Sequence, residues 1–167
     1  MKPLFTADQI QTRVQELGAQ ITRDYPEGDV VAIGILKGSF IFMSDLVRAI
    51  DRDVTLDFIA LSSYGDATET TGVVRLLKDL DVDIKDKDVI IIEDIVDTGL
   101  TLEYLTHYLQ QRLPSSIRVA TLLDKKSRRA IDIDIDYVGF EIDDGFIVGY
   151  GIDYAQKYRN LPWIGII

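Results

Sequence analysis

The stretch Val89 to Thr101, VIIIEDIVDTGLT, decides the fold. It begins with four consecutive apolar residues, and a short β-branched run of this kind predicts a strand buried on both faces, as in parallel sheets. Two adjacent carboxylates, Glu93 and Asp94, follow directly, and their burial is costly unless a cation or hydrogen-bond donors meet them there. Ligands of open α/β sheets bind at the carboxyl ends of the strands, so the acid pair indicates a ligand site.

A turn of small and hydroxylated residues, Asp97-Thr98-Gly99-Leu100-Thr101, follows the acid pair and leads into an expected helix. Backbone N–H groups at a helix start, together with the two threonine hydroxyls, suit a phosphate group. The same residues also fit an ordinary helix N-cap, because Asp and Thr favour that position. The two interpretations are compatible, since an uncapped helix N-terminus is itself an anion site.

Apolar runs alternate with helical spacings along the rest of the chain. A capping box at Thr6 and Gln9 predicts a helix that ends before Tyr25. Further helices are expected over residues 42–50 and 102–109, and strands over 30–36, 54–61, 72–77, 117–123, 137–142 and 146–148. The polar segment 62–72 indicates a mobile loop, and the alternation IDIDIDY (131–137) a strand with one solvated acidic face. This order predicts an α/β fold with a mainly parallel sheet flanked by crossover helices.

Composition narrows the class of protein. A length of 167 residues, with 47% apolar and 28% charged residues, predicts one globular domain over residues 1–167. The absence of cysteine excludes disulfides and thiol catalysis, which fits the cytoplasm. No apolar run approaches the ~18 residues that would span a membrane, and the N-terminus has no signal core. The net charge of −10 argues against a nucleic-acid partner, whereas a small anion bound through Mg²⁺ stays compatible.

The acid pair followed by Asp-Thr-Gly-x-Thr resembles the phosphoribosyl-diphosphate (PRPP) binding motif of the type I phosphoribosyltransferases. Three further features occur in the order of that family: LKGS at 36–39, Lys125 after the strand 117–123, and the tail GFIVGYGIDY at 145–154. The tail resembles the hypoxanthine-guanine subgroup. The resemblance covers nearly the whole chain and implies the type I fold, with a small hood built from terminal segments over the central sheet.

The resemblance assigns the PRPP half of the site. Glu93 and Asp94 would hold the ribose hydroxyls, directly or through Mg²⁺, because carboxylates accept from vicinal hydroxyls. The alternative is an exposed strand end with two solvated acids. The 5′-phosphate would lie against Asp97, Thr98, Gly99, Leu100 and Thr101. Some family members carry a basic residue where this chain has Leu100, so phosphate binding here would depend on backbone N–H groups and the threonines. Asp97 would act as the general base at purine N7.

Pyrophosphate would bind to Lys37 and Gly38 of the LKGS turn, where the Lys-Gly peptide can be cis, and to Arg159. On its own, LKGS is an ordinary turn with an exposed lysine. Asp153 would be a ligand of the Mg²⁺ on pyrophosphate, which makes Glu93, Asp94 and Asp153 the expected metal ligands. Ser63 and Tyr64 would belong to a lid that keeps water from an oxocarbenium-like transition state, although a surface hairpin has the same composition.

The purine would be recognised by Lys125, Phe146, Ile147 and Asp153. Lys125 would donate to the 6-oxo group, which selects hypoxanthine or guanine over adenine. Phe146 would stack on the ring, and the backbone of Ile147 would read the base edge. Without the resemblance, Lys125 would be a solvated lysine and the two apolar residues simple core. Arg129 is a weaker candidate for fixing the base-binding loop.

The reaction implied by the resemblance is the transfer of the 5-phosphoribosyl group from PRPP to a 6-oxopurine. It gives the nucleoside 5′-monophosphate and pyrophosphate with inversion at the anomeric carbon, with Mg²⁺ as cofactor. The resemblance also implies a homodimer or homotetramer. Two alternatives remain: a non-catalytic RNA-binding regulator on the same fold, and a phospho-acceptor receiver domain, in which the acid pair instead follows the first strand.

Overall fold

The computed structural model describes residues 1–63 and 74–167. Two sheets and three α-helices make up this part of the chain. In order, the elements are β1 (Lys2–Phe5), α1 (Ala7–Asp24), β2 (Val30–Leu36), α2 (Phe40–Arg48), β3 (Thr55–Ser63), β4 (Val74–Lys78), β5 (Asp88–Val96), α3 (Leu100–Gln110), β6 (Ser116–Asp124), the 3₁₀ helix η1 (Lys126–Arg128), β7 (Tyr137–Glu141), β8 (Ile147–Val148) and β9 (Ile164–Ile166).

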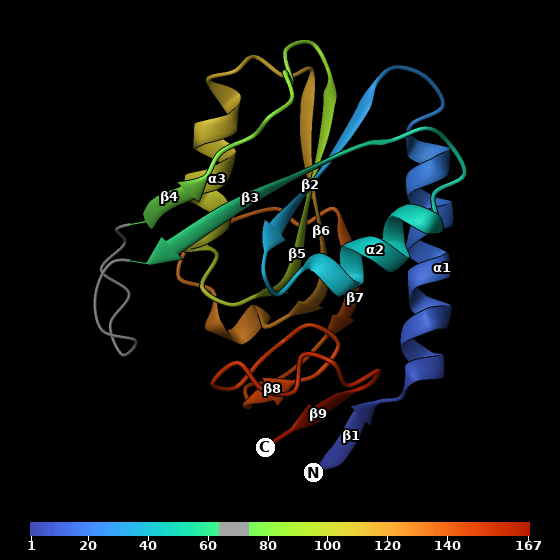
Figure 1. The fold of residues 1–167 in the computed structure, drawn as a ribbon, viewed down its shortest axis with the longest axis vertical. Helices are drawn as coiled ribbons and strands as arrows, with labels where there is room; N and C mark the ends of the chain where they lie inside the picture. The colour runs from blue at the N-terminus through green and yellow to red at the C-terminus, as the bar shows by residue number, and fades with distance from the viewer. Residues whose placement is uncertain (64–73) are drawn as a thin grey trace.

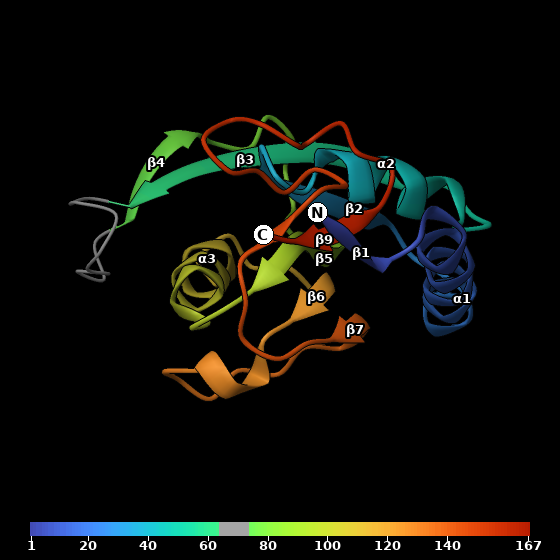
Figure 2. The ribbon, with the colours of Figure 1, turned by 90° about the horizontal axis from the view of Figure 1, so that it is seen from below.

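The larger sheet has the strand order β4-β3-β2-β5-β6-β7. Its neighbours pair in parallel from β3 to β7, and β4 alone runs antiparallel, beside β3. Helices α1 and α2 lie on one side of this sheet and α3 lies on the other (Figures 1 and 2). The predicted α/β class with a mainly parallel, helix-flanked sheet is therefore confirmed.

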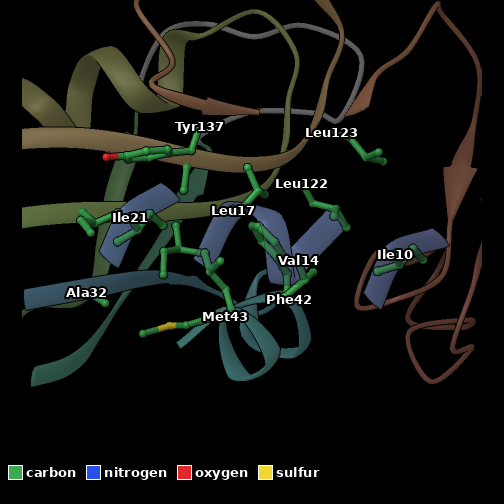
Figure 3. Packing of buried hydrophobic residues seen from close by; sticks show 14 of the residues in the cluster. Ile10, Val14, Leu17, Ile21, Ala32, Phe42, Met43, Leu122, Leu123 and Tyr137 are labelled. Carbon is green, nitrogen blue, oxygen red and sulfur yellow. The ribbon is translucent and has the colours of Figure 1, made fainter. Parts of the chain in front are cut away.

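Both faces of the central strands are buried, which explains their unbroken apolar sequences. In β5, Ile90 and Ile92 join the cluster formed with α1 and α2, whereas Val89 and Ile91 join the cluster formed with α3. Figure 3 shows the first cluster, in which the apolar side of α1 faces the sheet and α2. Each large side chain buried in this way contributes about 1.5–3 kcal/mol relative to exposure.

A second, three-stranded sheet of order β1-β9-β8 joins the two ends of the chain. Lys2 pairs with Ile166 and Pro3 with Gly165 in antiparallel register. This small sheet lies below the larger one in Figure 1, and in Figure 2 it is seen in front of β2 and β5. The hood of terminal segments that the resemblance implied is present.

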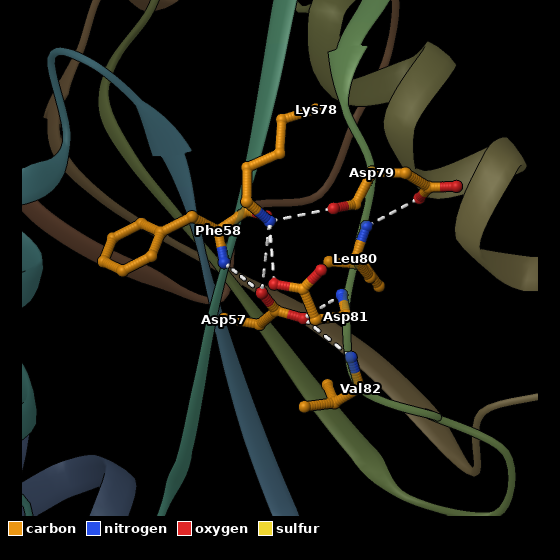
Figure 4. A network of polar contacts seen from close by, with 7 residues as sticks. All are labelled: Asp57, Phe58, Lys78, Asp79, Leu80, Asp81 and Val82. Carbon is orange, nitrogen blue, oxygen red and sulfur yellow. Dashed lines mark hydrogen bonds and ion pairs between the residues drawn. The ribbon is translucent and has the colours of Figure 1, made fainter.

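A buried carboxylate fixes the base of the β3–β4 hairpin. Asp57 accepts backbone N–H groups from Phe58 (2.7 Å), Asp81 (2.8 Å) and Val82 (3.0 Å), and Lys78 Nζ lies 3.6 Å from Asp57 Oδ1 (Figure 4). The two backbone bonds from the segment after β4 tie that segment back to β3.

The expected elements are present near their predicted bounds except in two places, and strands β1 and β9 were not predicted from local sequence patterns. The capping box of α1 at Thr6 and Gln9 is present. However, β5 does not end with its apolar run but continues to Val96, because its backbone still pairs with β6 there. The expected strand over 131–137 is wrong: residues 131–136 form no strand, and pairing with β6 begins at Tyr137. Its isoleucines Ile133 and Ile135 still pack on the α3 cluster, and the aspartates are exposed.

Two further sequence predictions concern the hairpin tip and the membrane. The expected loop over 62–72 and the lid residue Tyr64 fall mainly on residues 64–73, outside the described residues, and Ser63 ends β3. Within the described ranges, no helix is long and apolar enough to cross a membrane.

Candidate active site

Strand register brings the separate motifs to one edge of the larger sheet. Gly34 of β2 pairs with Ile92 of β5, so the LKGS turn leaves β2 beside the acid pair. Val96 at the end of β5 pairs with Asp124 at the end of β6, so Lys125 follows directly beside Asp97. Parallel strands share a carboxyl edge, and that edge is where open α/β sheets bind ligands.

Glu93 is buried with little compensation, and Asp94 beside it is partly buried. Glu93 is 8% exposed, and within the described ranges the one donor to its carboxylate is the backbone N–H of Asp94, at 3.1 Å from Oε1. Burial, and then the negative charge of Asp94, raise the pKa of Glu93 well above its ordinary value. Within the described ranges, neither Glu93 nor Asp94 forms a salt bridge to a lysine or arginine. Such a pair is arranged to meet donors or a cation from a ligand.

The LKGS turn packs directly against Asp94. A Cβ atom at Gly38 would lie 2.0 Å from Asp94 Oδ2, so this position has no room for a side chain. On its other side, a Cβ at Gly151 would lie 2.3 Å from the carbonyl oxygen of Gly38. The turn contains a cis peptide, but it joins Leu36 to Lys37 and not Lys37 to Gly38 as the resemblance had suggested.

The tail meets the LKGS turn through Gln156. Its Oε1 accepts from Lys37 Nζ (3.4 Å) and from an Arg159 guanidinium nitrogen (3.2 Å). Asp153 holds Gln156 and Arg159 in place within the tail. Its Oδ2 accepts the Gln156 N–H at 2.8 Å, and its Oδ1 lies 3.2 Å from Arg159 NH2. Three predicted residues, Lys37, Asp153 and Arg159, are thus brought together, and sequence analysis missed the residue that joins them.

The backbone of this tail adopts unusual conformations. Tyr150, Ala155, Gln156 and Tyr158 all have positive φ, between 49° and 77°. Non-glycine residues rarely adopt this region, and such residues gather where a site constrains the chain. A glutamine at position 156 gives no sequence signal that it joins Lys37 to Arg159, so only the three-dimensional contacts identify it.

The carboxylates of Glu93, Asp94 and Asp153 could supply some, but not all, of the ligands of a Mg²⁺ ion. Among the described residues, no three His, Cys, Asp or Glu side chains gather into a metal site. Mg²⁺ is typically bound through one or two carboxylates together with substrate phosphates and water. The carboxylates of Glu93, Asp94 and Asp153 fit that donor chemistry, because substrate phosphates and water would supply the remaining oxygens.

The turn of residues 97–101, which the resemblance assigns to the 5′-phosphate and which we call the phosphate turn, borders a small hollow of about 100 Å³. The hollow is lined by Glu93, Ile95, Val96, Asp97, Thr98, Gly99, Thr101 and Leu102. Gly99, with φ of 89°, is the N-cap of α3, so neither Asp nor Thr occupies the N-cap position that the alternative interpretation gave them. Thr98 Oγ1 accepts the Leu100 N–H at 3.4 Å. Backbone N–H groups at the start of a helix beside the hollow are the donors that an anion requires.

A second hollow, of about 530 Å³, adjoins the first and is lined by Asp97, Lys125, Arg128, Asp144, Gly145 and Phe146. Lys125 is 9% exposed and its Nζ donates to the Gly145 carbonyl at 2.8 Å. Phe146 is 56% exposed and meets Tyr154 edge to face at 5.2 Å. An exposed aromatic face beside a buried ammonium suits a planar ring that carries an acceptor.

Asp97 lines both hollows. Arg128 Nε lies 3.1 Å from its Oδ1, and Arg129 donates to its backbone oxygen at 2.9 Å. Ile147 is buried in β8. Sequence analysis named Arg129 for the base-binding loop but missed Arg128 and Asp144, because a charged residue in a loop carries no distinctive signal.

Comparisons with known proteins agree with this geometry. The family model of the phosphoribosyl transferase domain matches residues 4–155. The hypoxanthine-guanine phosphoribosyltransferase of Bacillus subtilis (strain 168) is 49% identical over 166 residues, which cover 99% of this chain and 92% of the relative. The enzyme of the same name from Staphylococcus aureus (strain Mu50 / ATCC 700699) is 52% identical over 164 residues, 98% of this chain and 92% of the relative.

Solved structures give the same result. A crystal structure of a hypoxanthine phosphoribosyltransferase from Staphylococcus aureus matches with a TM-score of 0.96 at 51% identity, covering 99% of this chain and 90% of that one. A hypoxanthine-guanine phosphoribosyltransferase from Bacillus anthracis, with a HEPES molecule in its active site, matches with a TM-score of 0.96 at 53% identity, covering 100% and 98%. These matches exclude the receiver-domain alternative. The chain therefore belongs to the phosphoribosyltransferase family.

Proposed function

We propose that this enzyme transfers the 5-phosphoribosyl group of PRPP to hypoxanthine, and to guanine, giving IMP or GMP and pyrophosphate in purine salvage. The observation that carries the proposal is the hollow in which a buried Lys125 and an exposed Phe146 lie beside Asp97. The names of the relatives from Bacillus and Staphylococcus support the same substrates.

PRPP would occupy the edge between the LKGS turn and the phosphate turn. The N-terminus of α3 and the threonines Thr98 and Thr101 would hold the 5′-phosphate. Glu93 and Asp94 would accept from the ribose hydroxyls. Lys37, the backbone of Gly38 and Arg159 would hold the pyrophosphate, with the planar guanidinium suited to two phosphate oxygens.

Mg²⁺ would be held by Glu93, Asp94 and Asp153 together with PRPP oxygens, and when bound it neutralises charge on the leaving pyrophosphate. The chain's own residues supply orientation. The contacts among Gly38, Asp94 and Gly151 leave little freedom in the relative positions of the leaving group and the ribose. Fixed geometry of this kind lowers the entropic part of the barrier.

In the reaction, purine N9 forms a bond to the anomeric carbon while the bond from that carbon to the pyrophosphate oxygen breaks. The base gains positive charge in this step, and Asp97 would take the proton from N7. Lys125 would donate to the 6-oxo group and stabilise the charge that it gains. Adenine presents a 6-amino donor at that place, which would leave the buried ammonium facing another donor.

The test is a substrate panel. Pyrophosphate release is measured with PRPP, Mg²⁺ and hypoxanthine, guanine, xanthine or adenine in turn. We expect turnover with hypoxanthine and guanine and much slower turnover with adenine. Failure with every 6-oxopurine would overturn the proposal, and salt-dependent RNA binding without turnover would favour the RNA-binding alternative. The panel also ranks hypoxanthine, guanine and xanthine.

The role of Asp97 is tested by Asp97→Asn. Loss of the general base should lower kcat by about 10²-fold or more, while PRPP binding, measured by calorimetry, persists. An unchanged kcat would limit Asp97 to a positioning role.

A further inference from the structure

The turn that follows β6 carries a cluster of cations, but only one of them reaches the carboxylate of Asp97. Arg128 Nε lies 3.1 Å from Asp97 Oδ1, and Arg128 NH1 lies 3.6 Å from Asp144 Oδ2. One guanidinium therefore spans two acids that line the same hollow of about 530 Å³. Its neighbour Lys126 points elsewhere and pairs with Glu141 at 2.7 Å.

The rest of this turn supports the backbone around Asp97. The Lys125 N–H donates to the carbonyl of Val96 (3.0 Å), and the Ala130 N–H donates to the carbonyl of Thr98 (2.9 Å). Arg129 donates to the carbonyl of Asp97 at 2.9 Å. These bonds fix where the main chain of Asp97 lies, but they do not fix the rotation of its side chain.

The orientation of the Asp97 carboxylate depends on Arg128. Within the described ranges, Arg128 supplies the one ion pair that this carboxylate makes. The contact involves Oδ1, so Oδ2 remains available as an acceptor in the hollow. A planar guanidinium fixes a carboxylate more tightly than a point charge does, because its donors have a fixed direction.

Asp144 connects this arginine to the other purine-binding group. It lies 3.6 Å from Arg128 and 3.7 Å from Lys125 Nζ, and Lys125 donates to the adjacent Gly145 carbonyl. The side chains of Arg128 and Asp97 are both about half exposed. Ion pairs of this kind contribute little to folding stability, with a median of about 0–1 kcal/mol. The arrangement therefore suggests a task other than holding the fold together.

Resting on the proposed function, we propose that Arg128 is a positioning residue for the proton transfer. It holds Asp97 through Oδ1 so that Oδ2 faces N7 of the purine, and Asp144 holds the far end of the guanidinium. The acceptor for N7 and the donor to the 6-oxo group are thereby set at a fixed separation. Arg128 acts through Asp97, and this separates its role from a direct contact with the purine.

The experiment is a double-mutant cycle. Arg128→Met is made in the natural sequence and in Asp97→Asn, with Lys126→Met as the matched control from the same 3₁₀ helix. In the natural background, Arg128→Met should lower kcat with hypoxanthine about tenfold, leave the KM for PRPP within about twofold, and leave Tm unchanged. In Asp97→Asn it should lower kcat by less than about twofold, because coupled residues do not add. Arg128→Lys should recover part of the rate.

An equal loss of kcat in both backgrounds would overturn the proposal, as would a loss that Lys126→Met reproduces. A measurement on the ligand-free protein, which requires no turnover, tests the positioning role of Arg128 independently of the proposed function. In the ligand-free protein, NMR scalar couplings should show one dominant χ1 rotamer of Asp97 in Lys126→Met and averaging between rotamers in Arg128→Met. If the natural enzyme turns over no 6-oxopurine, the proposed function fails, and a rotamer distribution that is the same in both variants overturns the positioning role as well.

Discussion

Two buried carboxylates of the larger sheet, Asp57 in β3 and Glu93 in β5, are held in opposite ways. They are 6% and 8% exposed. Asp57 accepts three backbone N–H groups and lies near Lys78, and although burial alone would raise its pKa, these bonds lower it below the ordinary value. Among the described residues, Glu93 accepts a single N–H, and burial together with the negative charge of Asp94 raises its pKa.

This difference in hydrogen bonding distinguishes Asp57, which has a structural role, from Glu93, which we propose is available to a ligand. The protein satisfies Asp57 completely enough that its charge stabilises the fold. Within the described ranges, Glu93 has acceptor capacity that the chain leaves unused, and this lowers the stability of the ligand-free protein at the place where we propose that ribose and Mg²⁺ bind. Local instability of this kind is expected at functional sites.

The largest expected effect on stability comes from replacing Asp57, the structural carboxylate. Asp57→Ala removes the acceptor from three backbone donors and should cost about 3 kcal/mol of unfolding free energy. Tm should then fall by about 6–12 °C for a chain of this size. The exposed Asp53→Ala is the matched control and should stay within about 0.5 kcal/mol. Thermal unfolding measures both, and equal losses would show that the Asp57 network is not special.

Gly38→Ala tests whether the proposed ligand site depends on the close contact between the LKGS turn and Asp94. The new Cβ would lie 2.0 Å from Asp94 Oδ2, so the LKGS turn and the acid pair have to separate. Because a misplacement of about 1 Å can cost 10²-fold in rate, kcat/KM for PRPP should fall by about that factor. Steady-state kinetics measure it. A variant with unchanged kcat/KM would mean that contact between turn and acid pair is dispensable.

Glu93→Gln should separate stability from activity. Removing a buried and poorly compensated charge should raise the stability of the ligand-free protein by about 1 kcal/mol at pH 7. The same change should lower kcat/KM by about tenfold or more, since a carboxylate acceptor is lost. Urea unfolding and kinetics test the two parts. A variant that is both less stable and inactive would contradict the comparison.

The pH dependence of stability should have opposite signs for the two groups. For Asp57 the folded pKa is lowered, so its contribution is present above the unfolded value of about 3.9 and is lost as pH falls through the folded value. For Glu93 the folded pKa is raised, so its contribution is present below about pH 4.3 and is lost as pH rises through the folded value.

Urea unfolding of the natural protein and both variants between about pH 3 and pH 8 checks these signs. The stability advantage of Glu93→Gln should be absent in acid and should grow as pH rises. The deficit of Asp57→Ala should shrink in acid. Curves that remain parallel to the natural protein over the whole range would contradict both assignments.

Much of the fold could be predicted from local patterns. The apolar runs of β2 and β5 predicted buried parallel strands, and the capping box at Thr6 predicted the start of α1. The prediction over 131–137 failed because alternation requires only one buried face. A segment packed on α3 without ladder pairing gives the same pattern as a strand.

Some residues of the candidate site could also be predicted from the sequence, and others could not. Glu93, Asp94, Asp97 and the turn after them were found because acids beside an apolar run are unusual in sequence. Gln156, Arg128 and Asp144 were missed because polar residues in loops are common, and only their contacts distinguish them.

The sequence by itself determined most of the strands and helices of the larger sheet, the acid pair after the apolar run of β5 and the turn that follows it, because hydrophobic periodicity and turn chemistry act between near neighbours along the chain. The tertiary structure alone decided which carboxylate is satisfied and which is left open, where the cis peptide lies, and that Arg128 reaches Asp97. These depend on distances between residues far apart in sequence, such as Asp57 with Val82 or Gly38 with Asp94, and no local pattern contains those distances.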